Sequence, residues 1–143
     1  MAVAVKRVYE KPVRADGARV LVDRLWPRGV RKQAVHAWLK DLAPSNELRR
    51  WFHARPQHWD TFRRRYLKEL AGESAAGALE ELYRLAETRS KLTLLFASRD
   101  LEHNNAVVLK QLLDGMRKPP TGTGPAAAAA MPGRQRARAR RPR

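Results

Sequence analysis

The stretch that decides the fold is V-L-V-D-R-L-W-P-R-G-V-R, residues 20–31. Its first residues are mostly apolar, as in a buried β-strand. Pro27 and Gly29 end this strand, because Pro27 has no N–H to donate and Gly29 tolerates a positive φ. Ligands of open α/β sheets bind where the strands end. The side chains expected at that position are Asp23, Arg24, Trp26 and Arg28.

Length and composition limit the class of protein. A chain of 143 residues is long enough for one domain with a core of its own. It has no cysteine, which excludes disulfides, thiolate catalysis and cysteine-ligated zinc. The N-terminal residues alternate like a strand rather than a signal peptide, and no run reaches the roughly 18 apolar residues of a membrane span. We expect a soluble, cytoplasmic protein.

The positive charge is distributed unevenly along the chain. The net charge is +16, and residues 117–143 carry eight basic and no acidic side chains, which leaves +8 on residues 1–116. A basic domain favours an anionic partner or substrate. Residues 118–143 form a Pro/Ala/Arg-rich tail that cannot bury enough surface to offset its chain entropy, so we expect it to be disordered. Its candidate nucleic-acid contacts are Arg134, Arg136, Arg138, Arg140, Arg141 and Arg143.

The pattern of apolar residues and breakers predicts an α/β domain over residues 1–117. Ser45 is the expected N-cap of one helix, and Gly72 the expected end of another. Strands are predicted at 3–9, 19–25 and 91–97, and helices at 32–42, from 46 and from 56, and at 75–88 and 101–116.

The connections between the strands predict their pairing. A long helical crossover joins strand 20–25 to strand 91–97, so these two form a parallel central pair. The link from strand 3–9 to strand 19–25 is too short for a standard parallel crossover. Those two are therefore an antiparallel pair or not neighbours. The expected fold is a small sheet with helices packed on it.

A second polar segment, residues 98–105, follows the other parallel strand and should reach the same sheet edge. Arginines beside a helix start are typical of an anion or phosphate site, although no Gly-rich phosphate loop is present. Asp100 is the expected N-cap of the helix. The candidate ligand-binding residues are Arg24, Trp26, Arg28, Asn104 and Asn105, and the candidate catalytic residues are Asp23, Asp100 and His103.

Each of these residues also has a purely structural interpretation. Asn105 falls on the core side of its helix, where it either ties the loop after strand 20–25 to the helix or faces a ligand. His103 falls on the opposite side, as a surface residue or a general acid/base. Trp26 is a stacking surface or a lid over the core. Arg24 either holds an anion or pairs with Asp100. The histidines lack metal-ligand spacing, so no metal site or cofactor is expected.

Four stretches carry a family resemblance: V-L-V-D-R-L-W-P-R-G-V-R-K (20–32), L-A-P-S-N-E-L-R-R-W-F-H (42–53), R-R-Y-L-K-E-L (64–70) and L-T-L-L-F-A-S-R-D-L-E-H-N-N-A-V-V-L (92–109). In this order they resemble the DUF488 family, in its YeaO-like branch. The resemblance covers residues 3–116 and implies a compact cytoplasmic α/β domain. The residues that match its signature are Asp23, Arg24, Trp26, Pro27, Arg28, Gly29, Asp100, His103, Asn104 and Asn105.

Two functions from different classes are consistent with these residues. One is a pocket or enzyme for a phosphate-bearing or otherwise anionic small molecule, such as a nucleotide, held at the sheet edge. The other is a nucleic-acid-binding accessory or regulatory protein, whose binding would fall steeply with salt. No sequence-reading motif for nucleic acid is visible. A third interpretation is a structural domain in which the signature residues join loop to helix.

Overall fold

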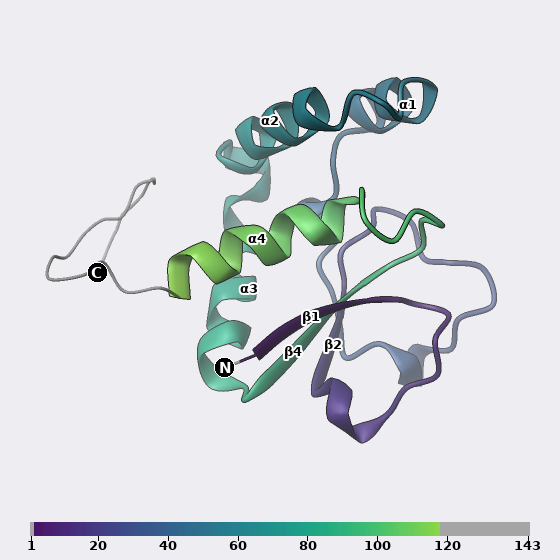
Figure 1. The fold of residues 1–143 in the computed structure, drawn as a ribbon. Helices are drawn as coiled ribbons and strands as arrows, with labels where there is room; N and C mark the ends of the chain where they lie inside the picture. Colours follow the sequence, from purple (N-terminus) through teal and green to yellow (C-terminus); the bar gives the residue numbers. More distant parts are fainter. Residues whose placement is uncertain (1, 118–143) are drawn as a thin grey trace, which may run out of the picture. The chain divides into compact units, whose positions relative to one another are not determined.

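The computed structural model describes residues 2–117, and its sheet confirms the predicted α/β class. Four parallel strands lie in the order β1-β4-β2-β3. Figure 1 shows the first three of them side by side. Residues 2–110 form one compact unit, and a second begins at Gln111 inside the last helix. The predicted domain boundary after residue 117 coincides with the end of the described part and stays a prediction. The strands are β1 (Ala2–Arg7), β2 (Ala18–Leu21), β3 (Ala37–Trp38) and β4 (Lys91–Phe96).

The strand β4 lies in the middle of the sheet and pairs on both sides. Its pairing with β2 is parallel, as predicted, with Val20 opposite Leu94. On its other side β1 is also parallel, with Val3 opposite Leu92. An antiparallel pair of β1 and β2 is therefore wrong, and the alternative that they are not neighbours is confirmed. β4 is nearly all apolar, and it lies between β1 and β2, where both of its edges are paired and most of its side chains are buried.

The connection from β1 to β2 is short but sufficient for parallel strands. Residues 8–17 return from the end of β1 to the start of β2 (Figure 1). Extended chain advances about 3.3 Å per residue, so this segment can span a strand of about 20 Å. It ends in the 3₁₀ turn Arg14–Asp16, where the Thr93 Oγ1 donates to the Asp16 carbonyl at 2.7 Å.

A helix over residues 32–42 is the main error of the sequence prediction. The structure has the 3₁₀ turn Lys32–Ala34, the short strand β3 and the 3₁₀ turn Lys40–Leu42. Backbone N–H groups of His36 and Leu39 donate to the carbonyls of Arg19 and Leu21. Pairing with the open edge of β2 thus overrides the helical spacing of the apolar residues. β2 itself ends at Leu21, before the predicted Leu25.

The three helices of the crossover lie close to their predicted positions. They are α1 (Asn46–Ala54), α2 (Trp59–Leu70) and α3 (Glu73–Thr88). Ser45 is the N-cap of α1, because its Oγ accepts from the Leu48 N–H at 3.1 Å. Gly72 precedes α3 as its N-cap rather than closing α2, and α2 begins at Trp59 rather than Pro56.

The last helix, α4 (Asn105–Arg117), begins four residues later than predicted. Its N-cap is Asn104, whose Oδ1 accepts from the Val107 N–H at 3.0 Å. Asp100 instead accepts from the N–H groups of Glu102 and His103, both at 3.0 Å, in the preceding turn. A capping side chain is present at Asp100, but the segment it closes is a single turn.

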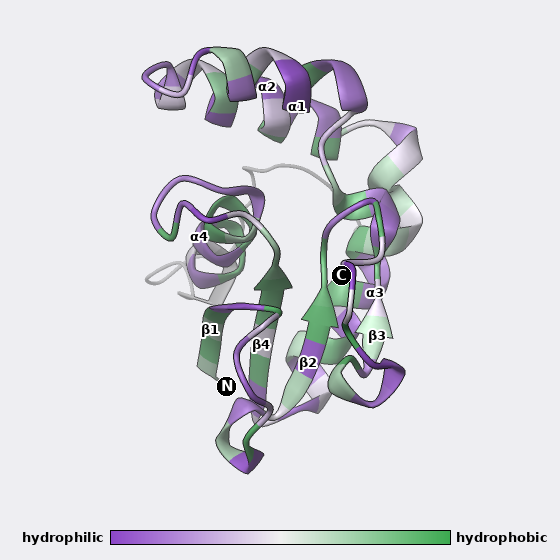
Figure 2. Cartoon of the chain, turned by 90° about the vertical axis from the view of Figure 1, so that its right-hand side faces the viewer, coloured by the Kyte–Doolittle hydropathy of each residue, from purple (hydrophilic) through white to green (hydrophobic). Residues whose placement is uncertain are grey.

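The core of the sheet is apolar, and the loops carry the polar residues. In Figure 2 hydrophobic residues fill β4 and the end of β2, and hydrophilic residues predominate in the connecting loops. No helix within residues 2–117 is both long and apolar enough to cross a membrane. The cytoplasmic location stays a prediction. The predicted disorder of residues 118–143 concerns residues outside the described part of the chain.

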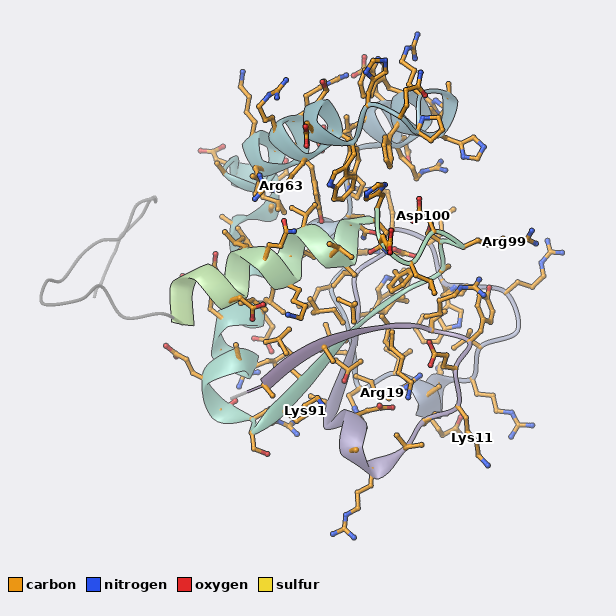
Figure 3. All side chains as sticks on the ribbon, viewed as in Figure 1. Lys11, Arg19, Arg63, Lys91, Arg99 and Asp100 are labelled. Carbon is orange, nitrogen blue, oxygen red and sulfur yellow. The ribbon has the colours of Figure 1, made fainter. Side chains whose placement is uncertain are left out.

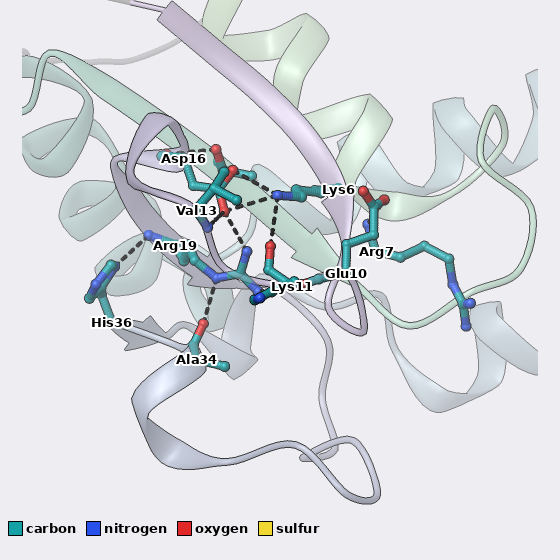
Figure 4. Close-up of polar contacts among 10 residues, drawn as sticks. Lys6, Arg7, Glu10, Lys11, Val13, Asp16, Arg19, Ala34 and His36 are labelled. Atoms are coloured by element: carbon teal, nitrogen blue, oxygen red, sulfur yellow. Dashed lines mark hydrogen bonds and ion pairs between the residues drawn. The ribbon is translucent and has the colours of Figure 1, made fainter.

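A buried ion-pair network lies at the start of β2, and the sequence prediction did not include it. The Arg19 guanidinium donates from Nη1 to the Asp16 carboxylate at 2.6 Å and from Nε to the Ala34 carbonyl at 2.6 Å (Figure 4). Lys6 Nζ contacts both carboxylate oxygens of Asp16, at 2.9 and 3.0 Å. Asp16 is 6% exposed and Arg19 1% exposed, so these charges are compensated inside the protein.

Candidate functional site

The two predicted polar segments meet at the end of the sheet through Asp23 and Asn105. The Asn105 Nδ2 donates to the Val22 carbonyl at 2.8 Å and to Asp23 Oδ1 at 3.2 Å. The other oxygen of Asp23, Oδ2, accepts from the Ala97 N–H at 2.9 Å. One carboxylate and one amide thus join the loop after β2, the end of β4 and the start of α4. The structure shows that Asn105 makes the tie between loop and helix.

Burial and hydrogen bonding act in opposite directions on Asp23. Its removal from solvent raises the pKa of the carboxyl group above its usual range. The N–H of Ala97, the amide of Asn105 and the charge of Arg49 oppose this and favour the carboxylate. Both oxygens of Asp23 already accept hydrogen bonds from the protein, so the group is held in place as a structural acceptor.

Tyr66 of α2 lies next to this pair, and it is fully buried. Its hydroxyl donates to the Leu42 carbonyl. Burial, together with the negative charges of Asp23 and Glu69, raises the pKa of Tyr66 well above its usual value, while Asn105 and Arg24 act the other way. The hydroxyl therefore stays protonated at neutral pH. The spacing of apolar residues along α2 predicts that Tyr66 is a core residue, but it does not predict the contacts of its hydroxyl group.

Arg24 lies on the other side of the loop and has one unsatisfied nitrogen. Its Nη2 donates to the Ala43 carbonyl at 3.2 Å, and its Nε is buried without a hydrogen-bond partner in the described part of the chain. No ion pair joins Arg24 to Asp23 or Asp100 among the described residues. A buried donor without a partner costs about 1–3 kcal/mol.

Arg24 lines a cavity of about 340 Å³ between the loop after β2 and the start of α3. The carboxylate of Glu69 there accepts from the Ser45 N–H at 2.8 Å and from the Ser45 Oγ at 2.7 Å. The cavity contains one guanidinium and three carboxylates, so its electrostatics differ from those of the predicted anion site. Its polar lining residues are Arg24, Asp41, Ser45, Glu69, Glu73 and Ser74.

The turn after β2 covers the core. The Trp26 Nε1 donates to the Val30 carbonyl at 2.9 Å, and its ring meets that of Trp38 edge-on at 5.4 Å. Trp26 packs on the buried Leu21, which makes it a lid over the core. Gly29 has the positive φ expected of it, 80°. Arg28, on the same turn, is exposed and does not line the cavity.

The loop after β4 holds the remaining predicted residues away from the cavity. Hydrogen bonds from the N–H groups of His103 and Glu102 lower the pKa of Asp100. The His103 ring stacks on Trp59 of α2 at 4.7 Å, and its Nδ1 is 3.9 Å from Asp100. Asn104 donates to the Asp100 carbonyl at 2.8 Å. Arg99 extends outward beside Asp100 (Figure 3).

The predicted residues therefore separate into three groups. Asp23 and Asn105 form the tie between loop and helix, Arg24 lines the cavity, and the residues of the two outer loops lie elsewhere. Sequence reasoning missed Glu69 and Tyr66, because a helical stripe shows which face is buried and not which polar groups reach across to a neighbouring loop. The tail arginines Arg134–Arg143 lie outside the described residues.

Replacing Asn105 by alanine should lower the free energy of unfolding by about 1–3 kcal/mol, because the Val22 carbonyl and one oxygen of Asp23 lose their donor. Urea denaturation measures the effect. The same substitution at Asn46, which is exposed at the start of α1, is the control and should change stability far less. Equal effects at both positions would contradict a structural role for the tie.

Comparison with known proteins agrees with the resemblance. A family described as "Inactive DUF488-N3 subclade" matches residues 2–128. The uncharacterised protein Rv3073c of Mycobacterium tuberculosis H37Rv is 47% identical over 115 residues, which cover 79% of this chain and 94% of the relative. The uncharacterised protein YeaO of Escherichia coli K12 is 43% identical over 117 residues, 79% of this chain and 97% of the relative. No solved structure matches with comparable significance. The chain therefore belongs to the DUF488 family, in the subclade described as inactive.

Proposed function

We propose that this chain is a binding protein whose ligand enters the cavity beside Arg24 and carries both an anionic and a cationic group. The observation that supports this is the composition of the cavity, in which one guanidinium with an unsatisfied Nε lies among three carboxylates. A volume of about 340 Å³ is at the small end of ligand pockets. An amino acid is a molecule of the right size and charge pattern.

Charge complementarity favours such a zwitterion over a simple anion. Arg24 suits a carboxylate, since guanidinium and carboxylate form strong charge-assisted hydrogen bonds. Asp41 and Glu73 suit an ammonium group, and Glu69 is already engaged by Ser45. Inorganic phosphate or a nucleotide would bring further negative charge to a cavity whose carboxylates outnumber its one guanidinium. The nucleotide suggested by the charge of the whole chain is therefore the less favoured ligand for this cavity.

Several features favour binding over catalysis. A general acid or base must reach the ligand with a pKa suited to proton transfer. Asp23 has both oxygens occupied by protein donors, and Tyr66 is held protonated. Asp100 and His103 do not line the cavity. The description of the family as inactive points in the same direction.

Thermal unfolding of the full chain in the presence of each of the twenty amino acids tests this proposal. A ligand at one hundred times its Kd adds about 2.7 kcal/mol of stability, which is a measurable rise in Tm. We expect one or a few amino acids to raise Tm, and inorganic phosphate and ATP not to do so. Arg24→Gln should remove the shift, and Arg28→Gln, an exposed arginine outside the cavity, should keep it.

Two results would refute the proposal. One is that no amino acid raises the Tm of the wild-type chain. The other is a rise of equal size in Arg24→Gln, which would place the ligand elsewhere.

Nucleic-acid binding through the arginine-rich tail is the second function that the charge suggests. It depends on residues 134–143, which lie outside the described residues, and it stays a prediction.

A further inference from the structure

The α1–α2 hairpin concentrates the positive charge of the domain. Its two helices and their connection, residues 46–70, carry seven basic and three acidic side chains. One of the acids, Glu69, is bound to Ser45 at the cavity. Figure 3 shows side chains projecting from both sides of α1 and α2. The basic residues are Arg49, Arg50, Arg55, Arg63, Arg64, Arg65 and Lys68.

One aromatic ring lies among these charges. The guanidinium carbons of Arg55 and Arg65 lie over the Trp51 ring, 5.4 and 4.9 Å from its centroid. The ring of His58 is 6.0 Å from the same indole. Arg55, His58 and Arg65 are all exposed, and Trp51 is half-buried. Trp51 therefore presents part of its surface at the centre of a basic patch.

The other aromatic residues of the hairpin have partners inside the protein. Phe52 stacks on the buried Phe62 at 4.4 Å, and Trp59 stacks on Phe62 and on His103. These rings form the internal face of the hairpin. Trp51, by contrast, makes its ring and cation contacts with His58, Arg55 and Arg65, which are all exposed.

We propose that the surface formed by Trp51, Arg55, His58 and Arg65 on the α1–α2 hairpin binds single-stranded nucleic acid. A base takes the place of a guanidinium over the Trp51 ring, and Arg55 and Arg65 turn to hold the adjacent phosphates. Proteins that bind single strands without sequence preference combine a basic surface with aromatic side chains on which bases stack. Guanidiniums suit phosphate because they donate parallel hydrogen bonds. The surface supplies both parts within one short hairpin.

An unpaired strand fits this surface better than a duplex or an acidic protein does. A base can stack on Trp51 only when its face is free, which is the case in a single strand. An acidic peptide would form ion pairs with the guanidiniums, but its carboxylates offer no flat ring to stack on the indole of Trp51. The inference is independent of the ligand proposed for the Arg24 cavity, because none of the residues involved lines that cavity.

Fluorescence anisotropy of the full chain with a labelled 20-nucleotide oligo(dT) tests the proposal. Trp51→Leu should weaken binding by about fivefold to hundredfold, the range found when a base loses its stacking partner. The slope of log K against log salt for Trp51→Leu should be the same as for the wild type. Trp51→Phe keeps an aromatic ring and should retain much of the affinity.

The arginines give a second, separate readout. Arg55→Gln/Arg65→Gln should reduce the slope of log K against log salt by about 1.4, since each phosphate contact with a single strand contributes about 0.7. Lys11→Gln/Arg14→Gln removes the same charge from an exposed loop at the other end of the sheet and serves as the matched control. Its salt slope should stay that of the wild type. All variants keep the tail, so the tail's contribution is the same in each.

Three outcomes would overturn the proposal. The first is wild-type affinity in Trp51→Leu with an unchanged circular dichroism spectrum. The second is equal affinity for a duplex of the same length, and the third is complete displacement of oligo(dT) by polyglutamate at equal charge concentration. If Trp51→Leu does not fold, an unchanged salt slope in the arginine double variant overturns it instead.

Discussion

Replacing Arg19 by leucine is expected to lower the free energy of unfolding by about 3–5 kcal/mol, the usual result of removing one partner of a buried ion pair. Arg19 is 1% exposed and donates to the carboxylate of Asp16 and the carbonyls of Ala34 and Glu10 (Figure 4). Leucine fills part of the volume but leaves all three acceptors without this donor. Lys6 stays near Asp16 and limits the loss.

The pH dependence of stability is a second readout of the same change. Burial alone would raise the pKa of Asp16, but donors from Lys6, Val13 and Arg19 outweigh it and lower the pKa to about 2. Because the pKa is lower in the folded state, Asp16 stabilises the fold above pH 4. This contribution, about 2 kcal/mol, is lost as the pH falls towards 2. In Arg19→Leu the pKa of Asp16 should move up, so the loss on acidification should be smaller.

Denaturation by urea at pH 7 and at pH 2.5 measures both effects. The exposed pair of Arg84 with Glu81 on α3 offers the control, since Arg84→Gln removes an arginine from an ion pair that water screens. That variant should unfold like the wild type. An Arg19→Leu chain that is as stable as Arg84→Gln would show that the buried network contributes nothing.

Replacing Gly17 by alanine should lower the free energy of unfolding by about 2–4 kcal/mol. Gly17 has φ 64° and ψ −136°, a conformation that residues with a side chain rarely adopt. A Cβ at this position would lie 2.3 Å from the Lys91 carbonyl oxygen, so the backbone must move. The movement would separate the start of β2 from the start of β4.

Gly77→Ala supplies the matched comparison, because the chemical change is the same. Gly77 lies inside α3, where an added Cβ meets nothing within 4 Å. Alanine favours a helix over glycine by about 0.5–1 kcal/mol, so this variant should be more stable than the wild type. Thermal melting of both variants measures the difference. Effects of the same sign at the two positions would contradict the close approach at Gly17.

Local sequence patterns correctly predict those elements whose structure is determined by residues a few positions away in the chain. The Ser45 cap, the stripe of α2 and the apolar β4 each depend on residues within a few positions. The segment 32–42 was predicted wrongly because its structure depends on the free edge of β2, which local spacing does not reveal. The same holds for the pairing of β1 with β4.

The candidate site follows the same division. Asp23 and Asn105 could be placed together, because each follows the end of one of two parallel strands, and the structure shows them in contact. Glu69 could not, since nothing in its helix distinguishes it from a solvent-exposed acid. The ion pair of Asp16 and Arg19 was missed for a related reason. In the sequence, charged residues in a turn and at the start of a strand look like ordinary exposed residues, and only the fold brings Lys6 and Thr93 into contact with Asp16.

The central place of β4 has a consequence for how the chain acquires its structure during synthesis. β1 is synthesised before β4, but β4 is its partner within the described sheet. The pairing of Ala2 with Lys91 can therefore form only after Lys91 has left the ribosome. Pairings between residues this distant in sequence form slowly, because the loop must close before the contact is gained. Until then both edges of β1 are unpaired, and unpaired strand edges are the sites at which a nascent chain can associate with other strands.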